Sequence, residues 1–157
     1  MKRIFKTAAI VFFAGMCLGG CKTHTSNAFY TFETECMGDE FDGSVVLRAW
    51  GQGSSRSDAL EKAKKKALYD IIFTGVRKGQ CNFKPLVTEA NAEEKYQSYF
   101  NRFFSDKGDY VDYIKMDATK MGSGEKSYAK TRNSYAAVVR VLRAELMEKL
   151  RNDNILK

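Results

Sequence analysis

Apolar and polar residues alternate in four stretches of the chain, a pattern that is typical of strands with one buried face. The strongest stretch is S-V-V-L-R-A-W, which combines β-branched residues with alternation. The four predicted strands are Ala28–Cys36, Ser44–Trp50, Asp109–Met116 and Ser134–Leu142.

Helical spacing predicts a long helix over Ser57–Thr74, where Ala59, Ala63, Ala67 and Ile71 form a ridge of small and apolar residues. Such a ridge allows close approach to a sheet. Ser55, with Asp58 three residues later, can cap the start of this helix, and Gly75 can end it.

Two further helices follow from the same periodicity. Asn91 and Glu94 form a capping pair for a helix to Phe104, whose apolar stripe we expect to be core packing: Tyr96, Tyr99, Phe100, Phe103, Phe104. Glu145–Leu150 reads as a short terminal helix.

The intervening segments are rich in turn-forming residues. Met37–Gly43 and Gly51-Gln52-Gly53 are expected to be turns, Val76–Val87 to be irregular, and Asp117–Arg132 to be a long hairpin loop. Together these elements predict one α+β domain over 28–157. It has a small, mostly antiparallel sheet with two main helices on one face, plus a short C-terminal helix.

The N-terminal segment has a different pattern. Lys2, Arg3 and Lys6 precede an apolar stretch, Thr7–Leu18, that is too short to span a bilayer. The tetrapeptide Leu18-Gly19-Gly20-Cys21 follows. It resembles the bacterial lipobox, and this resemblance implies cleavage of a signal peptide, 1–20, and fatty acylation of Cys21.

The polar segment Lys22–Asn27 is then a lipidated tether together with Cys21, and reaches at most ~20 Å. No run of acids follows Cys21, and residue 22 is a lysine rather than an aspartate. By resemblance, both features favour an outer-membrane lipoprotein that faces the periplasm. Inner-membrane retention and surface exposure stay open as alternatives.

Charge and cysteine content add predictions about partners, disulfides and metal sites. Loss of the three signal cations lowers the formal charge from +7 to about +4, so we expect no nucleic-acid partner. Cys36 and Cys81 remain, either as one disulfide or as two buried free thiols. The only histidine, His24, lies in the tether, so no metal site is expected.

Gly51-x-Gly53 lies between a strand and a helix, but Arg56 occupies the third glycine position of a dinucleotide fingerprint, so we expect no cofactor. The segment around it, R-A-W-G-Q-G-S-S-R-S-D-A-L-E-K-A-K-K-K-A-L-Y-D-I, resembles the strand, A-x-G-x-G turn and alanine-spaced helix of LPP-twenty-like envelope lipoproteins. A related domain begins a flagellar H-ring assembly protein. The resemblance covers Val45–Ile72. It implies a role in envelope assembly and transfers no functional residue.

No pair of residues marks a catalytic site, so we expect the chain not to be an enzyme. The candidate interaction surface comprises Trp50, Lys62, Lys65 and Lys66, although exposed lysines are also ordinary solvated residues. The leading hypothesis is a non-catalytic structural or interaction lipoprotein that contacts another envelope protein. The alternatives are a carbohydrate- or peptidoglycan-binding module and, less favoured, a carboxylate-based hydrolase.

Overall fold

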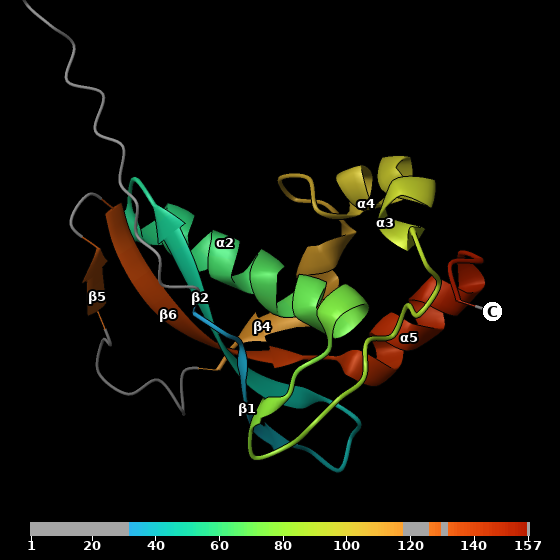
Figure 1. Cartoon of the computed structure of the whole chain (residues 1–157), viewed down its shortest axis with the longest axis horizontal. Coiled ribbons are helices and arrows are strands. Elements are labelled where there is room, and N and C mark those ends of the chain that lie inside the picture. Colours follow the sequence, from blue (N-terminus) through green and yellow to red (C-terminus); the bar gives the residue numbers. More distant parts are fainter. Residues whose placement is uncertain (1–31, 118–125, 130–131, 157) are drawn as a thin grey trace, which may run out of the picture.

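One sheet organises the domain in the computed structural model, which describes residues 32–117, 126–129 and 132–156 (Figure 1). The strand order is β3-β1-β2-β6-β4, and β5 also pairs with β6. Of the strand pairs in the described residues, only β1 and β3 are parallel. The strands are β1 (Glu35–Asp39), β2 (Val45–Gly53), β3 (Lys78–Gly79), β4 (Ile114–Met116), β5 (Lys126–Ala129) and β6 (Arg132–Val141).

The centre of the sheet is the long antiparallel pair β2–β6, which runs without interruption from Val45 opposite Val141 to Gly53 opposite Asn133. Alternate residues of both strands point into the core, where Leu47, Ala49 and Val139 are fully buried. The strong strand patterns of the sequence therefore form the middle of the sheet.

Helix α2 (Arg56–Tyr69) lies across β2 and β6 on one face of the sheet (Figure 1). Its first turn is capped as predicted, because the Ser55 hydroxyl accepts the backbone N–H of Asp58 at 3.2 Å. The predicted alanine ridge is the buried face, with Ala59, Ala63 and Ala67 at 0% exposure. Both the helix and its packing face are confirmed.

The last turn of this helix widens into a π-helix, η1 (Asp70–Thr74), which ends at Gly75 with φ of 78°. The carbonyl oxygens of Ile71 and Ile72 accept the backbone N–H groups of Leu86 and Val87, at 3.0 and 2.9 Å. A π-turn redirects carbonyls away from the regular ladder. The widened turn therefore anchors the segment after β3 across the end of α2.

The two glycines at the end of β2 correct a prediction. Gly51 and Gly53 were expected to form the strand-to-helix turn, but both pair with β6 inside the strand, and the turn lies at Ser54 and Ser55. A Cβ on Gly51 would overlap the Ala59 carbonyl and lie 2.6 Å from the Ala63 nitrogen. Their physical role is to let α2 approach the strand backbone closely.

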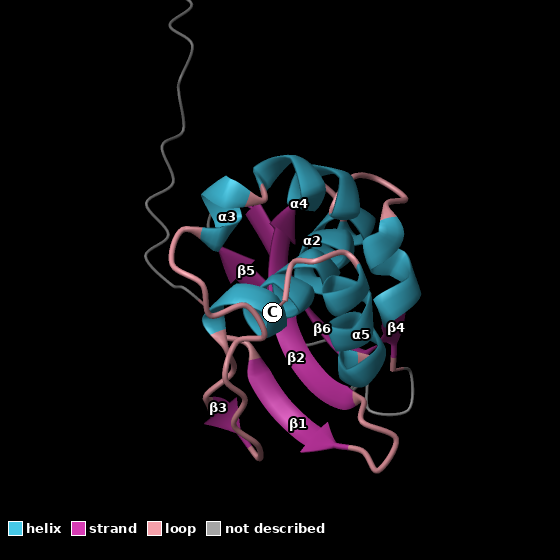
Figure 2. Cartoon of the chain, turned by 90° about the vertical axis from the view of Figure 1, so that its right-hand side faces the viewer, coloured by secondary structure: helices cyan, strands magenta, loops and turns pink. Residues whose placement is uncertain are grey.

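The predicted second helix is two short helices, α3 (Ala92–Lys95) and α4 (Gln97–Phe103), separated at Tyr96, whose φ and ψ are −106° and 22°. The expected capping pair is wrong: Asn91 adopts a left-handed conformation, with φ of 60°, and its side chain makes no capping hydrogen bond. These helices lie near the C-terminal end of α2 (Figures 1 and 2).

The expected aromatic packing of this segment is confirmed at its centre. Phe100 and Phe103 are 6% and 2% exposed. The C-terminal helix α5 (Arg143–Asn152) is longer than predicted, and it buries Leu146 and Leu150 against the same core.

Three other boundaries differ from the prediction. The first strand begins later than expected, at Glu35, and it extends to Asp39 into the expected turn; Phe32 stacks on Trp50, and residues 28–31 lie outside the described part. Asp109–Tyr113 is a 3₁₀ helix, η2, and only Ile114–Met116 is a strand. Part of the expected hairpin loop, Lys126–Ala129, forms β5.

The 3₁₀ spacing places Tyr110 and Tyr113 on one side, so that both can contact α4. Their rings lie 6.3 Å from the Phe104 centroid and 6.1 Å from the Phe103 centroid, respectively. Alternation over so short a stretch fits either geometry, and these aromatic contacts favour the helical one.

Of the two states left open for the remaining cysteines, the structure has the disulfide. Cys36 of β1 is bonded to Cys81, just beyond β3, and their Cα atoms lie 5.5 Å apart. Closing this loop of about 45 residues stabilises the fold by about 4 kcal/mol in the chain-entropy account.

The predicted α+β class is confirmed: a mostly antiparallel sheet carries helices on one side, and the described residues share one hydrophobic core. In Figure 2, β1 and β3 lie at the bottom of the molecule, and the helices lie above them and overlap the upper part of the sheet. Among the described residues, no helix is both long and apolar enough to cross a membrane.

Gly51→Ala tests the close approach of helix and strand. Alanine normally suits a strand at least as well as glycine, but here its methyl group would meet the Ala59 and Ala63 backbone. We expect a loss of about 2 kcal/mol or more in the free energy of unfolding, measured by urea denaturation. Gln52→Ala, one residue on and facing away from α2, is the control and should cost under about 0.5 kcal/mol. Equal effects would contradict this role.

Candidate functional site

A hollow of about 470 Å³ opens where the C-terminal end of α2 meets α3 and α4. We call it the acidic aromatic groove. Its size is within the usual range for ligand pockets. Eight residues line it, from α2, η1, α3, α4 and the position just after α4: Tyr69, Phe73, Glu93, Glu94, Gln97, Phe100, Asn101 and Phe104.

A continuous row of four aromatic rings forms the floor of the groove. The ring centroids of Tyr69 and Phe73 lie 5.1 Å apart, and those of Phe73 and Phe100 lie 4.7 Å apart, edge to face. Phe104 extends the row, with its centroid 6.3 Å from that of Phe100. Phe100 is buried, whereas the other three rings are only partly buried, so the row keeps accessible surface.

Polar side chains at the rim of the groove come mainly from α3 and α4. Glu93 accepts a hydrogen bond from the Tyr69 hydroxyl at 2.6 Å. Glu94, Gln97 and Asn101 are exposed beside it. Among the described residues, those that line the groove include two carboxylates and no lysine or arginine, so its lining carries a formal charge of −2.

The hydrogen bond to Glu93, together with partial burial, raises the pKa of Tyr69 from 10.0 to about 12. A group whose folded-state pKa is raised stabilises the fold fully below its unfolded pKa and loses that effect as pH rises through the folded value. This hydrogen bond therefore contributes fully below pH 10 and is lost as the pH approaches about 12.

The predicted interaction surface is divided by the structure. Lys62, Lys65 and Lys66 lie on α2, whereas Trp50 lies on β2 between Ala49 and Gly51, which face α2. Because strand residues alternate, Trp50 points to the opposite face of the sheet. Phe32 stacks on its indole, with ring centroids 4.5 Å apart, and covers one side of it.

The lysines of this predicted surface are engaged in ion pairs. Lys62 contacts Asp58 at 3.1 Å, and Lys65 contacts Asp106, also at 3.1 Å. Lys66 pairs with Asp70 at the start of η1. Their positive charges are therefore compensated locally, which weakens the interpretation of α2 as a basic binding surface.

Sequence reasoning did not identify Asp70 as a buried partner of Lys66 and Thr34. Its side chain is only 3% exposed, and it accepts the Thr34 hydroxyl at 2.5 Å in addition to the Lys66 ammonium. A hollow of about 350 Å³ adjoins it. The only sequence signal was an aspartate four residues after a lysine on a helix, a spacing that is common on exposed surfaces.

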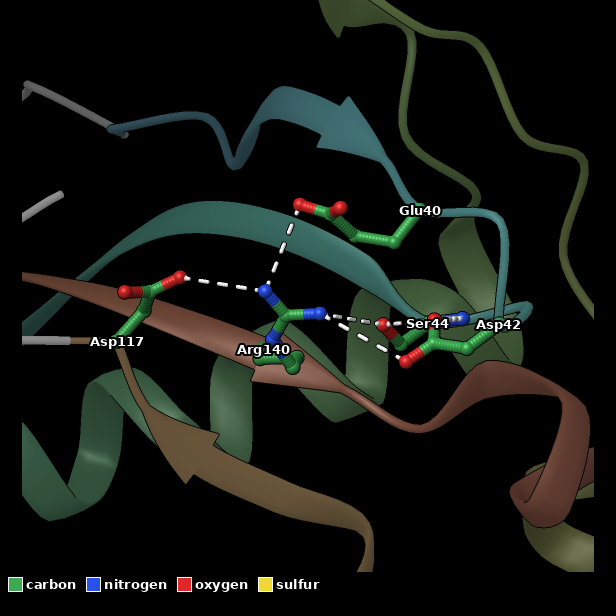
Figure 3. Close-up of polar contacts among 5 residues, drawn as sticks. All are labelled: Glu40, Asp42, Ser44, Asp117 and Arg140. Atoms are coloured by element: carbon green, nitrogen blue, oxygen red, sulfur yellow. Dashed lines mark hydrogen bonds and ion pairs between the residues drawn. The ribbon is translucent and has the colours of Figure 1, made fainter. Parts of the chain in front are cut away.

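A second polar cluster lies on the sheet face opposite α2, around Arg140 of β6 (Figure 3). Its guanidinium donates to the Ser44 hydroxyl at 3.1 Å and lies 3.5 Å from Glu40. It also lies 3.8 Å from Asp42 and 3.9 Å from Asp117, whose side chain is 7% exposed. Arg140 thus joins the β1–β2 turn to the segment after β4.

Hydrogen bonds from Ser44 hold this turn in shape. They are the main cause that lowers the pKa of Asp42 below its usual 3.8, and the charge of Arg140 adds to it. No sequence motif indicated the cluster, because its members are brought together only by the pairing of β2, β4 and β6.

The lipidation residue Cys21 lies outside the described residues, as do the signal segment and the tether. Within the described ranges, no group of three or more histidine, cysteine, aspartate or glutamate side chains could hold a metal ion. Comparisons of the chain with models of protein families, with curated proteins and with solved structures find no match. The resemblance to LPP-twenty-like lipoproteins stays a prediction.

Glu93→Gln tests the hydrogen bond at the rim of the groove. Since an uncharged amide stabilises the neutral phenol less, the pKa of Tyr69 should fall from about 12 toward 10.0, measured by NMR titration of tyrosine ring carbons. Glu94→Gln is the matched control, because Glu94 is adjacent but does not bond Tyr69; it should leave the titration close to that of the parent protein. A parent Tyr69 that already titrates near 10 would contradict the geometry.

Arg140→Met tests the cluster on the sheet. The variant keeps much of the side chain's apolar contact but removes the charge that faces buried Asp117. Because Arg140 is itself 34% exposed, we expect a loss of about 1–3 kcal/mol, less than for a fully buried pair. Arg151→Met, at an exposed position of α5, should change the urea midpoint little. Comparable losses in both variants would exclude a specific role for the cluster.

Proposed function

We propose that this chain is a membrane-anchored lipoprotein of the bacterial envelope that acts by binding a partner, without catalysis. It would face the periplasm from the outer membrane and serve in envelope assembly or maintenance. The single observation on which this rests is the tetrapeptide Leu18-Gly19-Gly20-Cys21, at the end of a basic and then apolar segment. Fatty acids on Cys21 would hold the protein at the bilayer, because two or three chains bind far more firmly than one.

Chain length supports a position close to the membrane. Ten residues lie between Cys21 and Phe32, where the described domain begins, and the eleven Cα–Cα steps from Cys21 to Phe32 can span at most ~40 Å. A binding surface on the domain would therefore meet partners that are themselves in, or near, the membrane surface.

The form of the acidic aromatic groove supports binding as the mode of action. Exposed aromatic surface combined with a few polar groups is typical of recognition sites. The groove is lined by the C-terminal end of α2, η1, α3 and α4, with no residue of the strands among its described lining residues.

A carbohydrate- or peptidoglycan-binding role is less well supported. Such a role was expected to depend on Trp50 as a stacking platform, but Phe32 already covers one side of the indole. The acidic aromatic groove offers a larger aromatic surface, and its carboxylates favour a positively charged ligand over a neutral one.

Cys21→Ser tests the anchor. Serine offers no thiol to acylate, so the variant should be released from the membrane fraction or remain unprocessed. Cys17→Ser is a matched control, because it removes a cysteine only four residues earlier and should leave membrane association unchanged. The measurement is fractionation of cells with mass analysis of the N-terminal peptide. Full membrane retention of Cys21→Ser with a parent-like N-terminus would refute the proposal.

A further inference from the structure

We propose that the acidic aromatic groove binds the alkylammonium side chain of a lysine presented by a partner protein. This inference names the ligand chemistry of the proposed interaction module, and therefore rests on the proposed function. Three features of the groove lead to it: its aromatic floor, the sign of its charge, and its continuation along α3.

The floor suits the hydrocarbon part of a lysine. Tyr69, Phe73, Phe100 and Phe104 form a row in which neighbouring centroids are 4.7 to 6.3 Å apart. Four methylene groups can lie along such a row and leave water, while the charged end stays at the rim. An ammonium group near aromatic faces also gains cation–π attraction.

The charge of the groove selects a cation. Glu93 and Glu94 line it, and the described lining residues provide no positive charge against them. Two lysines of neighbouring turns are already paired: Lys66, whose ammonium lies 5.9 Å from the Tyr69 ring centroid, is bound to Asp70, and Lys95 contacts Glu89 at 2.6 Å. On a chain whose net charge is positive, this groove is thus a local negative site.

Another hollow of similar size differs from the groove in the charges of its lining residues. The hollow between α4 and α5 has a similar volume, about 470 Å³, but it is lined by Arg102 and Lys149 as well as Asp109 and Asp153. The two positive and two negative charges of this lining balance, and the Lys149 ammonium already lies 2.9 Å from the Asp153 carboxylate. The acidic aromatic groove differs, because no cation among its described lining residues balances the carboxylates of Glu93 and Glu94.

The groove continues beyond the space that one side chain needs. A second hollow of about 350 Å³ shares Phe73, Glu93 and Glu94 with it, and extends past Val87 to Glu89. Two hollows that share these residues of η1 and α3 provide room for a stretch of backbone that carries the lysine. This favours a protein segment over a free amine.

The experiment titrates the protein as it is isolated from cells, in neutral detergent, with three probes and follows the aromatic ring signals by NMR. The probes are acetyl-Gly-Lys-Gly-amide, the same peptide with norleucine in place of lysine, and n-butylammonium. Norleucine keeps the alkyl chain and removes the charge, whereas n-butylammonium keeps charge and alkyl chain and removes the backbone. We expect the lysine peptide to bind at least tenfold more tightly than the norleucine peptide, and more tightly than the free amine.

The double variant Glu93→Gln/Glu94→Gln should weaken binding of the lysine peptide about tenfold, because both carboxylates become neutral. Glu148→Gln, at an exposed position of α5, removes a charge far from the groove and should have no effect. Unchanged ring signals elsewhere verify that the variants are folded.

Three results would overturn the proposal: equal binding of the lysine and norleucine peptides, binding that is insensitive to the double variant, or no response of the groove signals. Binding of n-butylammonium as tight as that of the peptide would also reject a protein partner. None of these results bears on Cys21, so the anchor and the groove can fail independently.

Discussion

The contact between α2 and the backbone of β2 is the constraint on which the rest of the domain depends. Gly51 and Gly53 supply no side chain at the crossing, and Ala59 and Ala63 supply only methyl groups, so that helix and strand meet almost backbone to backbone. A contact this close fixes the helix along β2 and β6. It thereby also fixes the position of Tyr69 and Phe73 at the far end, where they become the floor of the groove.

The elements that could be predicted from the sequence are those whose signal is local and repeated. The alanine ridge of α2, its Ser55 cap and the β-branched run of β2 each report a buried face directly. The break at Tyr96 and the 3₁₀ turn at Asp109 could not be predicted, because tertiary contacts decide them against ambiguous local patterns. The disulfide partners were identified, but composition alone could not decide whether they were bonded.

The candidate site was harder to predict than the fold, for a related reason. Periodicity shows which residues are apolar, but it does not show which charges meet across elements. The lysines of α2 look like a basic surface in sequence, yet their partners include Asp70 in the core and Asp106 beyond α4. The groove joins residues 69–73 to residues 93–104. Its negative charge can be recognised only when the ion-pair partners of the α2 lysines are known.

If the chain is held by its N-terminal end, as we propose, the bond between Cys36 and Cys81 has a mechanical consequence. Tension entering at Phe32 reaches Cys36 four residues later and passes through the sulfur atoms to Cys81. The enclosed loop contains β2, α2 and η1, which are therefore shielded from force along the backbone. The covalent cross-link lets the molecule be pulled without unravelling the helix–strand pair at its centre.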